Sequence, residues 1–435
     1  MNVVHVSCHD NDGGAARAAW RVHDSVRMAY VESSMFVAFC EGHDPAVQQY
    51  QPSNAVTARI RRTIRHTMLR RALTRASRSQ PPGAETFRDD RTKFGPDVAS
   101  TTPPADIYHL HQITEFVDYQ TTLRRLVARA PIVWTLHEMT PFTGGCHYAS
   151  GCDGFAGGCG ACPQLGSEKQ DDFSHSVWRR KRRVYDRIPP ARFHVVGASQ
   201  WIAGEAQRSS LFGRFPISVI PYGIDTDVFR PVPEARRLLE ALELPPTARI
   251  VLFVSDWLGN PRKGFDLLDA ALHARPLPNV ALVSLGRGDP LRLQSTIPHV
   301  HLGGFTEDRM LAIAHSLADV FVIPSREDNL PNTVLEAMAC GTPVVGFRTG
   351  GIPELVQDGV NGLLAAPGDV SGLAGAIEAL LDDEPRRVAM GRAARDAAKH
   401  QYSRQLQGER YRRLYESILD GDGRPSPHGD RPAAA

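Results

Sequence analysis

The sequence predicts an α/β protein of two successive Rossmann-like domains, each with a parallel β-sheet covered by helices on both faces. Three observations lead to this prediction. The chain has 435 residues, whereas one domain usually takes ~100–200. Short, almost continuously apolar runs alternate with segments of helical spacing, which is typical of buried parallel strands. After about Gly223 the same alternation starts again.

The first half opens with an apolar run, Val3–Ser7, followed by a polar loop that contains glycines. Ala15, Ala18, Val22 and Val26 then recur at helical spacing, which predicts a helix after the first strand. The further strands expected in this half are Met35–Phe39, Ala105–Leu110, Ile132–Leu136, Phe193–Gly197 and Ile217–Ile220.

The second half repeats this pattern. Its expected strands are Ile250–Val254, Val280–Leu285, Val300–Gly303, Val320–Ile323 and Pro343–Phe347. Its expected helices are Asp266–His273, Glu307–Ser316, Asn332–Cys340, Leu373–Leu381, Arg386–Lys399 and Arg404–Leu419. We therefore expect domains over 1–221 and 222–400, a C-terminal helix over 401–419 and a disordered tail over 420–435, which is rich in proline and glycine.

Composition excludes several classes of protein. Fifty Lys and Arg face 48 Asp and Glu, for a net charge of +2, so no excess of positive charge points to nucleic acid. No apolar run approaches the ~18 residues of a membrane span. The start, MNVVHVSCH, lacks the basic region of a signal peptide. We expect a cytoplasmic enzyme.

Three familiar motifs of α/β enzymes are absent. Only Gly13-Gly14 follows the first strand, and Gly286-Arg-Gly288 lacks the third glycine of a dinucleotide site. In the sequence GNPRKG the lysine precedes the second glycine, so it is not a P-loop. Ser199 is followed by Gln and Trp, which excludes the hydrolase elbow.

Arg262 and Lys263 precede a predicted helix after the first strand of the second half. Paired cations beside a helix N-terminus suit a bound diphosphate. An ordinary basic helix start is the alternative, although cations oppose the helix dipole there.

A second polar loop, PSREDNLPNTVLEAMA at Pro324–Ala339, runs into a predicted helix. Backbone N–H groups at that helix start could hold sugar or phosphate oxygens. Glu336 could reach a ribose diol, or it could make only a surface or capping contact.

Four of the seven cysteines fall within 17 residues, inside the glycine-rich loop 144–163. They are Cys146, Cys152, Cys159 and Cys162. Four thiolates suit a closed tetrahedral zinc site of structural type, in which His147 could replace one thiolate. The alternative is four reduced cysteines that pack the loop.

Arg59 to Arg78 contains eight arginines and no acidic residue, with Ile60, Ile64, Met68 and Leu73 near helical spacing. This pattern predicts either a solvated helix or a helix that lies on an anionic membrane surface. In the second case the protein would be peripheral to the inner face of the cell membrane.

Three segments together resemble retaining glycosyltransferases of family 4, which have the GT-B fold. These segments are PRKGFDLLDAAL, LADVFVIPSREDNLPNTVLEAMACGTPVVGF and GGIPELVQDGVNGLLAAPGD. The stretch TLHEMTPFTGGCHY, with the cysteines after it, is similar to transferases of the colanic-acid and exopolysaccharide type. The resemblance extends to about residue 418. It implies two Rossmann-like domains facing a cleft, with C-terminal helices returning to the first domain.

The resemblance also implies a division of labour, in which the second domain binds a nucleotide sugar and the first binds a glycan or lipid-linked acceptor. Arg262 and Lys263 would neutralise the leaving diphosphate without a divalent metal, and His137 would face the donor sugar, with His111 as a second candidate. The substrate-binding residues would be Gly13, Gly14, Asp328, Asn329, Leu330 and Glu336. No protein nucleophile is needed, because the leaving phosphate can take the acceptor's proton.

The sequence departs from the family pattern at three places. Asp328 replaces the first acid of the E-x7-E pair that ends at Glu336, and Ser255-Asp256 replaces a strand-end Gly-Arg. The usual N-G-x-D reads YGID from Tyr222. These departures keep a rival hypothesis open, a non-catalytic GT-B subunit or scaffold of a polysaccharide-assembly complex. An epimerase or phosphorylase is less favoured, because no signature of either is evident.

Overall fold

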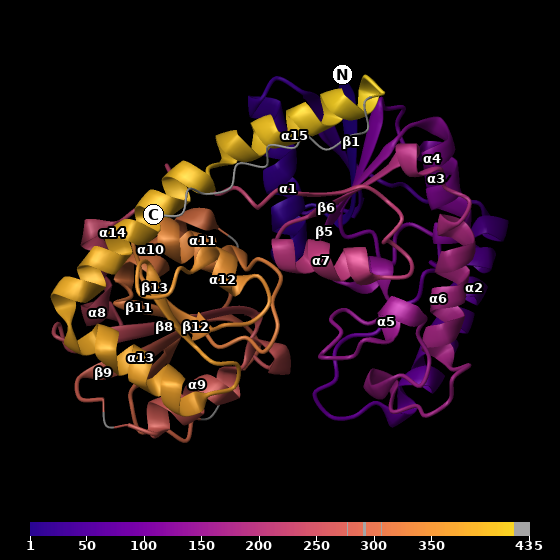
Figure 1. The fold of residues 1–435 in the computed structure, drawn as a ribbon. Helices are drawn as coiled ribbons and strands as arrows, with labels where there is room; N and C mark the ends of the chain where they lie inside the picture. Colours follow the sequence, from indigo (N-terminus) through magenta and orange to yellow (C-terminus); the bar gives the residue numbers. More distant parts are fainter. Residues whose placement is uncertain (276, 290–292, 306, 422–435) are drawn as a thin grey trace. The chain divides into compact units, whose positions relative to one another are not determined.

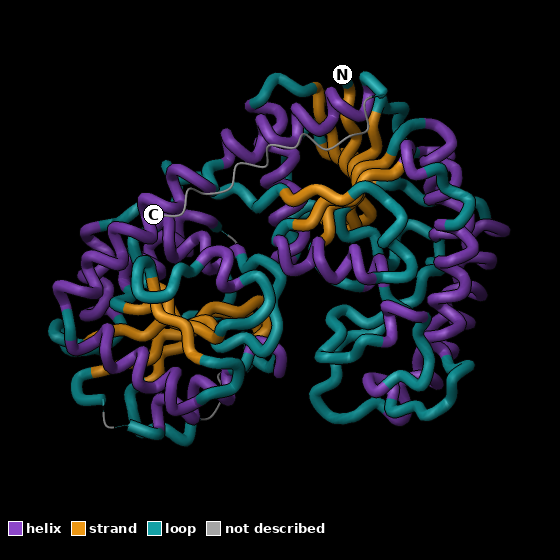
Figure 2. The backbone as a smooth tube through the Cα atoms, in the orientation of Figure 1, coloured by secondary structure: helices purple, strands orange, loops and turns teal. Residues whose placement is uncertain are grey.

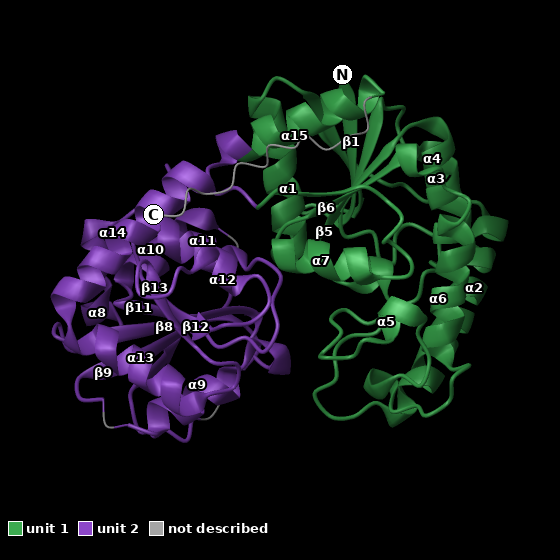
Figure 3. Cartoon of the chain, viewed as in Figure 1, with its two compact units in different colours: residues 1–221, 407–435 green, residues 222–406 purple. Residues whose placement is uncertain are grey.

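The computed structural model describes residues 1–421 except 276, 290–292 and 306, and it forms two compact units (Figure 1, Figure 3). Unit 1 comprises Met1–Pro221 and the chain from Gln407 onward, and unit 2 comprises Tyr222–Leu406. The division falls within the last helix, α15 (Arg404–Leu419). Of the tail expected to be disordered, 420–435, the part from 422 onward lies outside the described residues.

Unit 1 is built on a seven-stranded sheet in the order β3-β2-β1-β4-β5-β6-β7. Each neighbouring pair is parallel, so the carboxyl ends of the strands share one edge. The strands are β1 (Asn2–His9), β2 (Glu32–Phe39), β3 (Val47–Gln49), β4 (Ile107–Leu110), β5 (Ile132–Leu136), β6 (Phe193–Gly197) and β7 (Ile217–Val219). The expected strands are confirmed. The edge strand β3 was not expected, because two of its three residues are glutamines.

Helices cover both faces of this sheet (Figure 2). One face packs α1 and α15 through Val22, Val26, Tyr411 and Tyr415. The other packs the segment around α4 and α6 through a larger core that includes Trp134. The helices of unit 1 are α1 (Gly13–Met28), α2 (Val56–Ala76), α3 (Asp97–Thr101), α4 (Arg124–Arg129), α5 (Gly154–Gly157), α6 (Phe173–Tyr185), α7 (Gln200–Arg208) and the later part of α15.

Unit 2 contains a six-stranded sheet in the order β10-β9-β8-β11-β12-β13, again with parallel pairs. The strands are β8 (Arg249–Trp257), β9 (Val280–Arg287), β10 (His299–His301), β11 (Val320–Ile323), β12 (Val344–Phe347) and β13 (Gly362–Ala365). The helices are α8 (Leu238–Ala241), α9 (Phe265–His273), α10 (Asp308–Leu317), α11 (Asn332–Ala339), α12 (Ile352–Leu355), α13 (Val370–Asp382) and α14 (Glu384–Gln401). The predicted strands are present. The strand β13 was not expected, because its apolar run is short and flanked by glycines.

Membrane-spanning segments were not expected from the sequence. Within the part of the chain that the structure describes, no helix has both the length and the apolar character needed to cross a bilayer.

Candidate functional site

The turn after β8 in unit 2 packs closely against the loop after β11. The Asn260 side chain accepts a hydrogen bond from the backbone N–H of Arg262 at 3.0 Å, which fixes the turn. Gly264 has a φ of +71°, and a Cβ there would lie 2.0 Å from the carbonyl oxygen of Pro324. Only glycine therefore allows this approach. This close packing brings Arg262 and Lys263, in the turn after β8, next to Asp328, in the loop after β11.

Lys263, Arg262 and Asp328 form a charged cluster at this edge. Lys263 Nζ lies 2.6 Å from Asp328 Oδ2, and Arg262 Nη1 lies 3.6 Å from Asp328 Oδ1. Arg262 also donates to the carbonyl of Glu327 at 2.8 Å, and the Ser325 hydroxyl donates to Asp328 at 3.2 Å. One carboxylate thus contacts two cationic side chains.

The charge on Asp328 is maintained inside the protein. Burial by itself would raise the pKa of this carboxyl, but the nearby Lys263 and Arg262 outweigh burial, and the pKa is lowered. The side chain is 5% exposed. A buried carboxylate of this kind is held by its cationic partners, and it in turn orients them.

The loop between β11 and α11 is buried and held from a second side. Asn329 and Leu330 are 2% and 3% exposed, just before the start of α11. The backbone N–H of Gly351 donates to the carbonyl of Asp328 at 3.0 Å. Gly350 has a φ of +55°, and a Cβ there would lie 1.9 Å from the same carbonyl oxygen. The loops after β8, β11 and β12 therefore form one packed unit at the edge of the sheet.

Glu336 lies on α11 and is 3% exposed, so the alternative of a surface contact is wrong. Its Oε2 is 3.7 Å from Nε2 of His315, a wholly buried residue of α10. That distance is too long for a hydrogen bond. The ribose-binding role of Glu336 stays a prediction.

In unit 1, the first turn of α1 begins with two glycines at the carboxyl end of β1. Gly13 has a φ of +84°, which favours glycine. A Cβ on Gly14 would meet no heavy atom within 4 Å. The space that a side chain of residue 14 would fill is therefore empty, as the close approach of a bound phosphate or sugar would require.

His137 follows β5 at the same edge of the unit 1 sheet and is 8% exposed. Its Nε2 lies 3.1 Å from Nδ1 of His111, whose Nε2 lies 2.9 Å from Nδ1 of His5. Burial lowers the pKa of His137 to about 4, although the charge of Glu138 acts in the opposite direction. The imidazole is therefore neutral at pH 7.

Two members of this histidine cluster, His5 and His109, were not predicted as site residues. In the sequence His5 lies within the apolar run Val3–Ser7, which predicted only a strand. The signal that could have found them is the period of two in a strand, since positions 107, 109 and 111 share a face, as do 133, 135 and 137. In the parallel register His5 lies opposite His109.

The cysteine loop holds four reduced thiols. Burial raises the pKa of Cys159 to about 12, and the Gly144 N–H donates to its sulfur at 3.1 Å. Among the described residues, groups of three possible ligand atoms within 4.8 Å of one another occur at His5, His109 and His111 and at His9, Asp12 and Glu41, but not at the four cysteines. Sulfurs on one zinc ion lie about 3.8 Å apart, given Zn–S bonds of ~2.3 Å. Zinc would therefore have to draw the loop together, and it stays a prediction for Cys146, Cys152, Cys159 and Cys162.

His147 makes other contacts. Its Nδ1 lies 3.0 Å from Glu85 and its Nε2 lies 2.5 Å from Glu138. Since both ring nitrogens face carboxylates, neither is left for a metal, and His147 is not a ligand in this arrangement. Burial would raise the pKa of Glu138, but His147 and hydrogen bonds outweigh it and lower the pKa to about 2.

The arginine-rich stretch forms helix α2, which contains no buried residue. Val56, Ile60, Ile64 and Met68 follow one another at a spacing of four, and they are 69%, 55%, 56% and 65% exposed. Three of them border a groove of about 680 Å³ that α2 forms with the segment 91–97. Arg65 is anchored to Asp118 at 2.6 Å. The helix thus presents an apolar row among arginines.

The predicted site residues fall into two groups, one in each unit. Unit 1 carries Gly13, Gly14, His137 and the four cysteines, and unit 2 carries Arg262, Lys263, Asp328, Asn329, Leu330 and Glu336. Within unit 2 the structure brings Arg262, Lys263 and Asp328 into contact.

Comparison with known proteins gives relatives for both units. Residues 248–383 match the family described as "Glycosyl transferases group 1". A GDP-mannose-dependent α-(1-6)-phosphatidylinositol monomannoside mannosyltransferase of Mycobacterium tuberculosis is 36% identical over 255 residues. That match covers 54% of this chain but 65% of the relative, just under two thirds of its length. A putative colanic acid biosynthesis glycosyl transferase of Escherichia coli is 23% identical and covers 82% of this chain and 85% of the relative.

Solved structures agree with the fold. Sucrose-phosphate synthase from Thermosynechococcus elongatus aligns with 97% of this chain and 99% of its own, with a TM-score of 0.68 and 19% identity. HepE from Anabaena, in complex with UDP-glucose, aligns with 96% of this chain and 100% of its own, with a TM-score of 0.64 and 18% identity. The resemblance expected from the motifs is confirmed. The chain has the GT-B fold, and its residues 248–383 are similar to the group 1 glycosyl transferases.

Proposed function

We propose that this chain is a retaining glycosyltransferase, which moves a sugar from a nucleotide-sugar donor to a glycan or lipid-linked acceptor in surface-polysaccharide or glycoconjugate assembly. The observation that carries the proposal is the Arg262–Lys263–Asp328 cluster. It lies at the carboxyl edge of a parallel sheet, where α/β proteins bind ligands, and inside the segment of the group 1 family.

The chemistry needs positive charge at this place. When the bond between sugar and phosphate breaks, the diphosphate gains negative charge and the sugar becomes oxocarbenium-like. Cations that are already oriented stabilise that charge without reorganisation, which is commonly the largest catalytic contribution. Asp328 orients Lys263 at 2.6 Å before a donor arrives. Two cationic side chains supply the stabilisation, so the proposed reaction is independent of a divalent metal.

Retention follows from the same arrangement. The leaving phosphate can accept the acceptor's proton on the face from which it departs, so the configuration at the sugar carbon is kept. Neither a protein nucleophile nor the paired carboxylates of a glycosidase are needed. Gly13, Gly14 and His137 of unit 1 are proposed as further substrate-binding residues.

A lipid-linked acceptor is supported by α2. The exposed row of Val56, Ile60, Ile64 and Met68 would enter the boundary between headgroups and acyl chains, while the arginines contact anionic headgroups. The names of the relatives agree with a glycan or lipid-linked acceptor. The M. tuberculosis enzyme is named for a phosphatidylinositol glycolipid and the E. coli protein for colanic acid.

The proposed activity is tested with a panel of nucleotide sugars, read first by thermal shift and then by release of nucleoside diphosphate. A ligand at 100 times its dissociation constant adds ~2.7 kcal/mol to stability. Lys263→Ala should lower turnover by about 10²–10³ with the donor identified in this way, the loss typical of one oriented charge stabiliser.

The matched control is Arg275→Ala, since Arg275 makes an exposed ion pair with Glu378 in the same unit. Its turnover should equal that of the wild type. If no nucleotide sugar shifts the melting temperature and none is turned over, the chain is the non-catalytic subunit and the proposal fails.

A further inference from the structure

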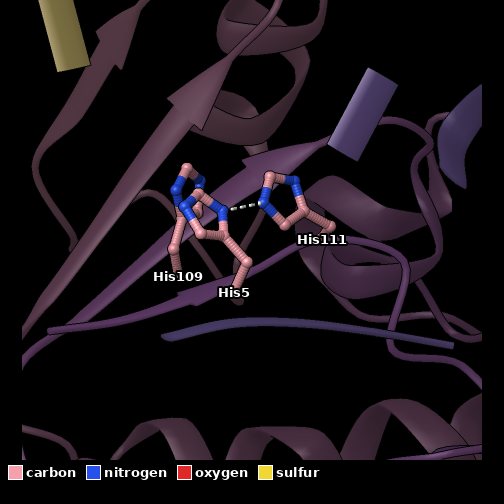
Figure 4. Close-up of side chains that lie close together, drawn as sticks. All are labelled: His5, His109 and His111. Carbon is pink, nitrogen blue, oxygen red and sulfur yellow. Dashed lines mark hydrogen bonds between the residues drawn. The ribbon is translucent and has the colours of Figure 1, made fainter. Parts of the chain in front are cut away.

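The buried histidines of unit 1 form a hydrogen-bonded row that ends at His137. His5 Nδ1 and His111 Nε2 are 2.9 Å apart, and His111 Nδ1 and His137 Nε2 are 3.1 Å apart. Figure 4 shows the first of these bonds, with the ring of His109 beside that of His5. Exposure is 0% at His5, 2% at His111 and 8% at His137. The row thus runs from the core towards the edge of the sheet.

The four imidazoles of this region are neutral. Burial, more than any neighbouring charge, lowers the pKa of His5, His109 and His111 well below the ordinary value. A neutral imidazole carries one N–H and one lone pair. Because His111 is bonded at both ring nitrogens, it must donate one hydrogen bond and accept the other. All N–H groups in the row therefore point in one direction.

The unpaired end of the row decides which direction that is. The Nε2 atom of His5 is buried and has no hydrogen-bond partner among the residues that the structure describes. If the N–H groups pointed from His137 towards His5, this atom would be a buried donor without an acceptor, which is rare and costly. If they point towards His137, it is only an unpaired lone pair. The second direction places the single ring hydrogen of His137 on Nδ1.

A metal ion shared by His5, His109 and His111 is the competing interpretation, since their ligand atoms lie within 4.8 Å of one another. However, His109 already bonds the Tyr415 hydroxyl at 2.6 Å and the Thr135 hydroxyl at 2.7 Å. The 2.9 Å between His5 and His111 is also shorter than the ~3.3 Å between two nitrogens on one tetrahedral zinc ion. Hydrogen bonds account for these distances better than a metal does.

We propose that His5 and His111 are positioning residues that fix His137 as the Nδ1–H tautomer, so that it acts in the transferase as a hydrogen-bond donor through Nδ1 and not as a base. The role as donor to a sugar hydroxyl or phosphate oxygen rests on the function proposed above, whereas the tautomer does not. His109 stacks on the row, with its ring centroid 4.2 Å from that of His111. Its Nδ1 also bonds the Tyr415 hydroxyl of α15.

The direct test is nuclear magnetic resonance of the full chain with 15N-labelled histidine at pH 7.5, with His137 assigned by the signals missing from His137→Gln. Nδ1 of His137 should show the shift of a protonated nitrogen and Nε2 that of an unprotonated one. A proton on Nε2, or on both nitrogens, would overturn the proposal whether or not the protein is active. Changes in these signals on addition of zinc would also overturn the proposal and would favour a metal site.

The kinetic test separates positioning from simple packing. His5→Phe should lower kcat about tenfold with little change in the donor's KM, and His5→Asn, which restores an N–H close to that of Nδ1, should recover most of the rate. In a His137→Phe background, His5→Phe should have no further effect, because the row has lost its end. An equal loss in both backgrounds would show a purely structural role and refute the proposal.

The control variant is His194→Phe. His194 is 4% exposed on β6 of the same sheet and bonds the Ser218 hydroxyl at 2.9 Å, outside the row. It should lower the melting temperature as much as His5→Phe does while leaving kcat unchanged. If it lowers kcat equally, the loss reflects general destabilisation, which contradicts the proposal.

Discussion

The carboxyl edges of the two sheets carry polar groups of opposite kinds. In unit 2, the edge holds a buried carboxylate between two cations, Lys263 and Arg262. In unit 1, it holds neutral imidazoles bonded to one another, ending at His137. Both sheets are parallel and both edges are buried, so the backbone does not cause the difference. The same architecture can thus hold a charged cluster at one edge, where we propose that a diphosphate binds, and a row of neutral imidazoles at the other.

The two edges also avoid the free-energy cost of burying an unpaired charge in different ways. A buried charge is tolerated when it is paired, as Asp328 is. A buried imidazole avoids the cost by remaining unprotonated. This difference should make the two units respond differently to acid.

The largest expected effect is a selective loss of stability of unit 1 below pH 6.5. An imidazole whose pKa is lower folded than unfolded binds more protons when unfolded, so the free energy of unfolding falls as pH drops from about 6.5 towards the folded value. Each such group contributes up to ~1.4 kcal/mol per pH unit. In unit 1 the groups are His5, His23, His109, His111, His137 and His194.

Hydrogen exchange followed by mass spectrometry on the full chain, at pH 7.5, 6 and 5 and corrected for intrinsic rates, measures this loss. Protection of β1, β4 and β5 should fall by orders of magnitude, while that of β8 and β11 should change less. An equal change in both units would remove the distinction between a neutral and a charged edge.

The second effect concerns the cysteine loop, which carries the predicted zinc. Protein purified without chelator should contain about one zinc ion per chain. Cys159→Ser should lose that zinc and lower the melting temperature by several degrees, because metal binding contributes to folding. The matched substitution Cys340→Ser, at a buried cysteine of unit 2, should leave the zinc content unchanged. Metal-free protein with an unchanged melting transition in Cys159→Ser would exclude zinc.

The third effect concerns lipid. Arg70→Ala/Arg71→Ala on α2 should weaken binding to anionic liposomes by roughly 10- to 30-fold at low salt, since each basic residue near the surface contributes ~1 kcal/mol. The control pair is Arg412→Ala/Arg413→Ala on α15, whose side chains are also exposed. Co-sedimentation at rising salt measures both. Equal binding to neutral and anionic liposomes would refute the electrostatic contact.

The smallest effect is expected at Glu336. Ribose contacts exist in the ground state and in the transition state alike, so Glu336→Gln should raise the donor's KM by about tenfold and leave kcat nearly unchanged. Steady-state kinetics measure the two constants separately. A fall in kcat at constant KM would place Glu336 in the chemical step and not in ribose binding.

The sequence was sufficient for the fold because period and composition agreed along most of the chain. Near-continuous apolar runs such as Ile132–Leu136 predicted buried parallel strands, and the structure has them. The sequence was less informative for the outermost strand of a sheet, where burial is partial. The strand Val47–Gln49 is mostly polar, and its place depends on pairing with β2.

The site was predictable only in part, for a similar reason. Arg262, Lys263 and Asp328 lie in loops with unusual charge, and their contact follows from the close approach at Gly264. The histidine row was predictable only in part, because His5 and His111 lie 106 positions apart in sequence and become neighbours only through the pairing of β1 with β4. The burial of Glu336 beside His315 likewise depends on how α10 packs against α11.

Unit 2 is proposed to bind the diphosphate of a nucleotide-sugar donor through Lys263 and Arg262. Isothermal titration calorimetry of the wild type, Lys263→Ala and Arg275→Ala with UDP and GDP tests it most directly. One of the two nucleotides should bind the wild type and Arg275→Ala with equal affinity, and it should bind Lys263→Ala at least tenfold more weakly, as expected when a charge-assisted contact of ~1.5–3 kcal/mol is lost. Equal affinity for Lys263→Ala, or no binding of either nucleotide to the wild type, would contradict the account.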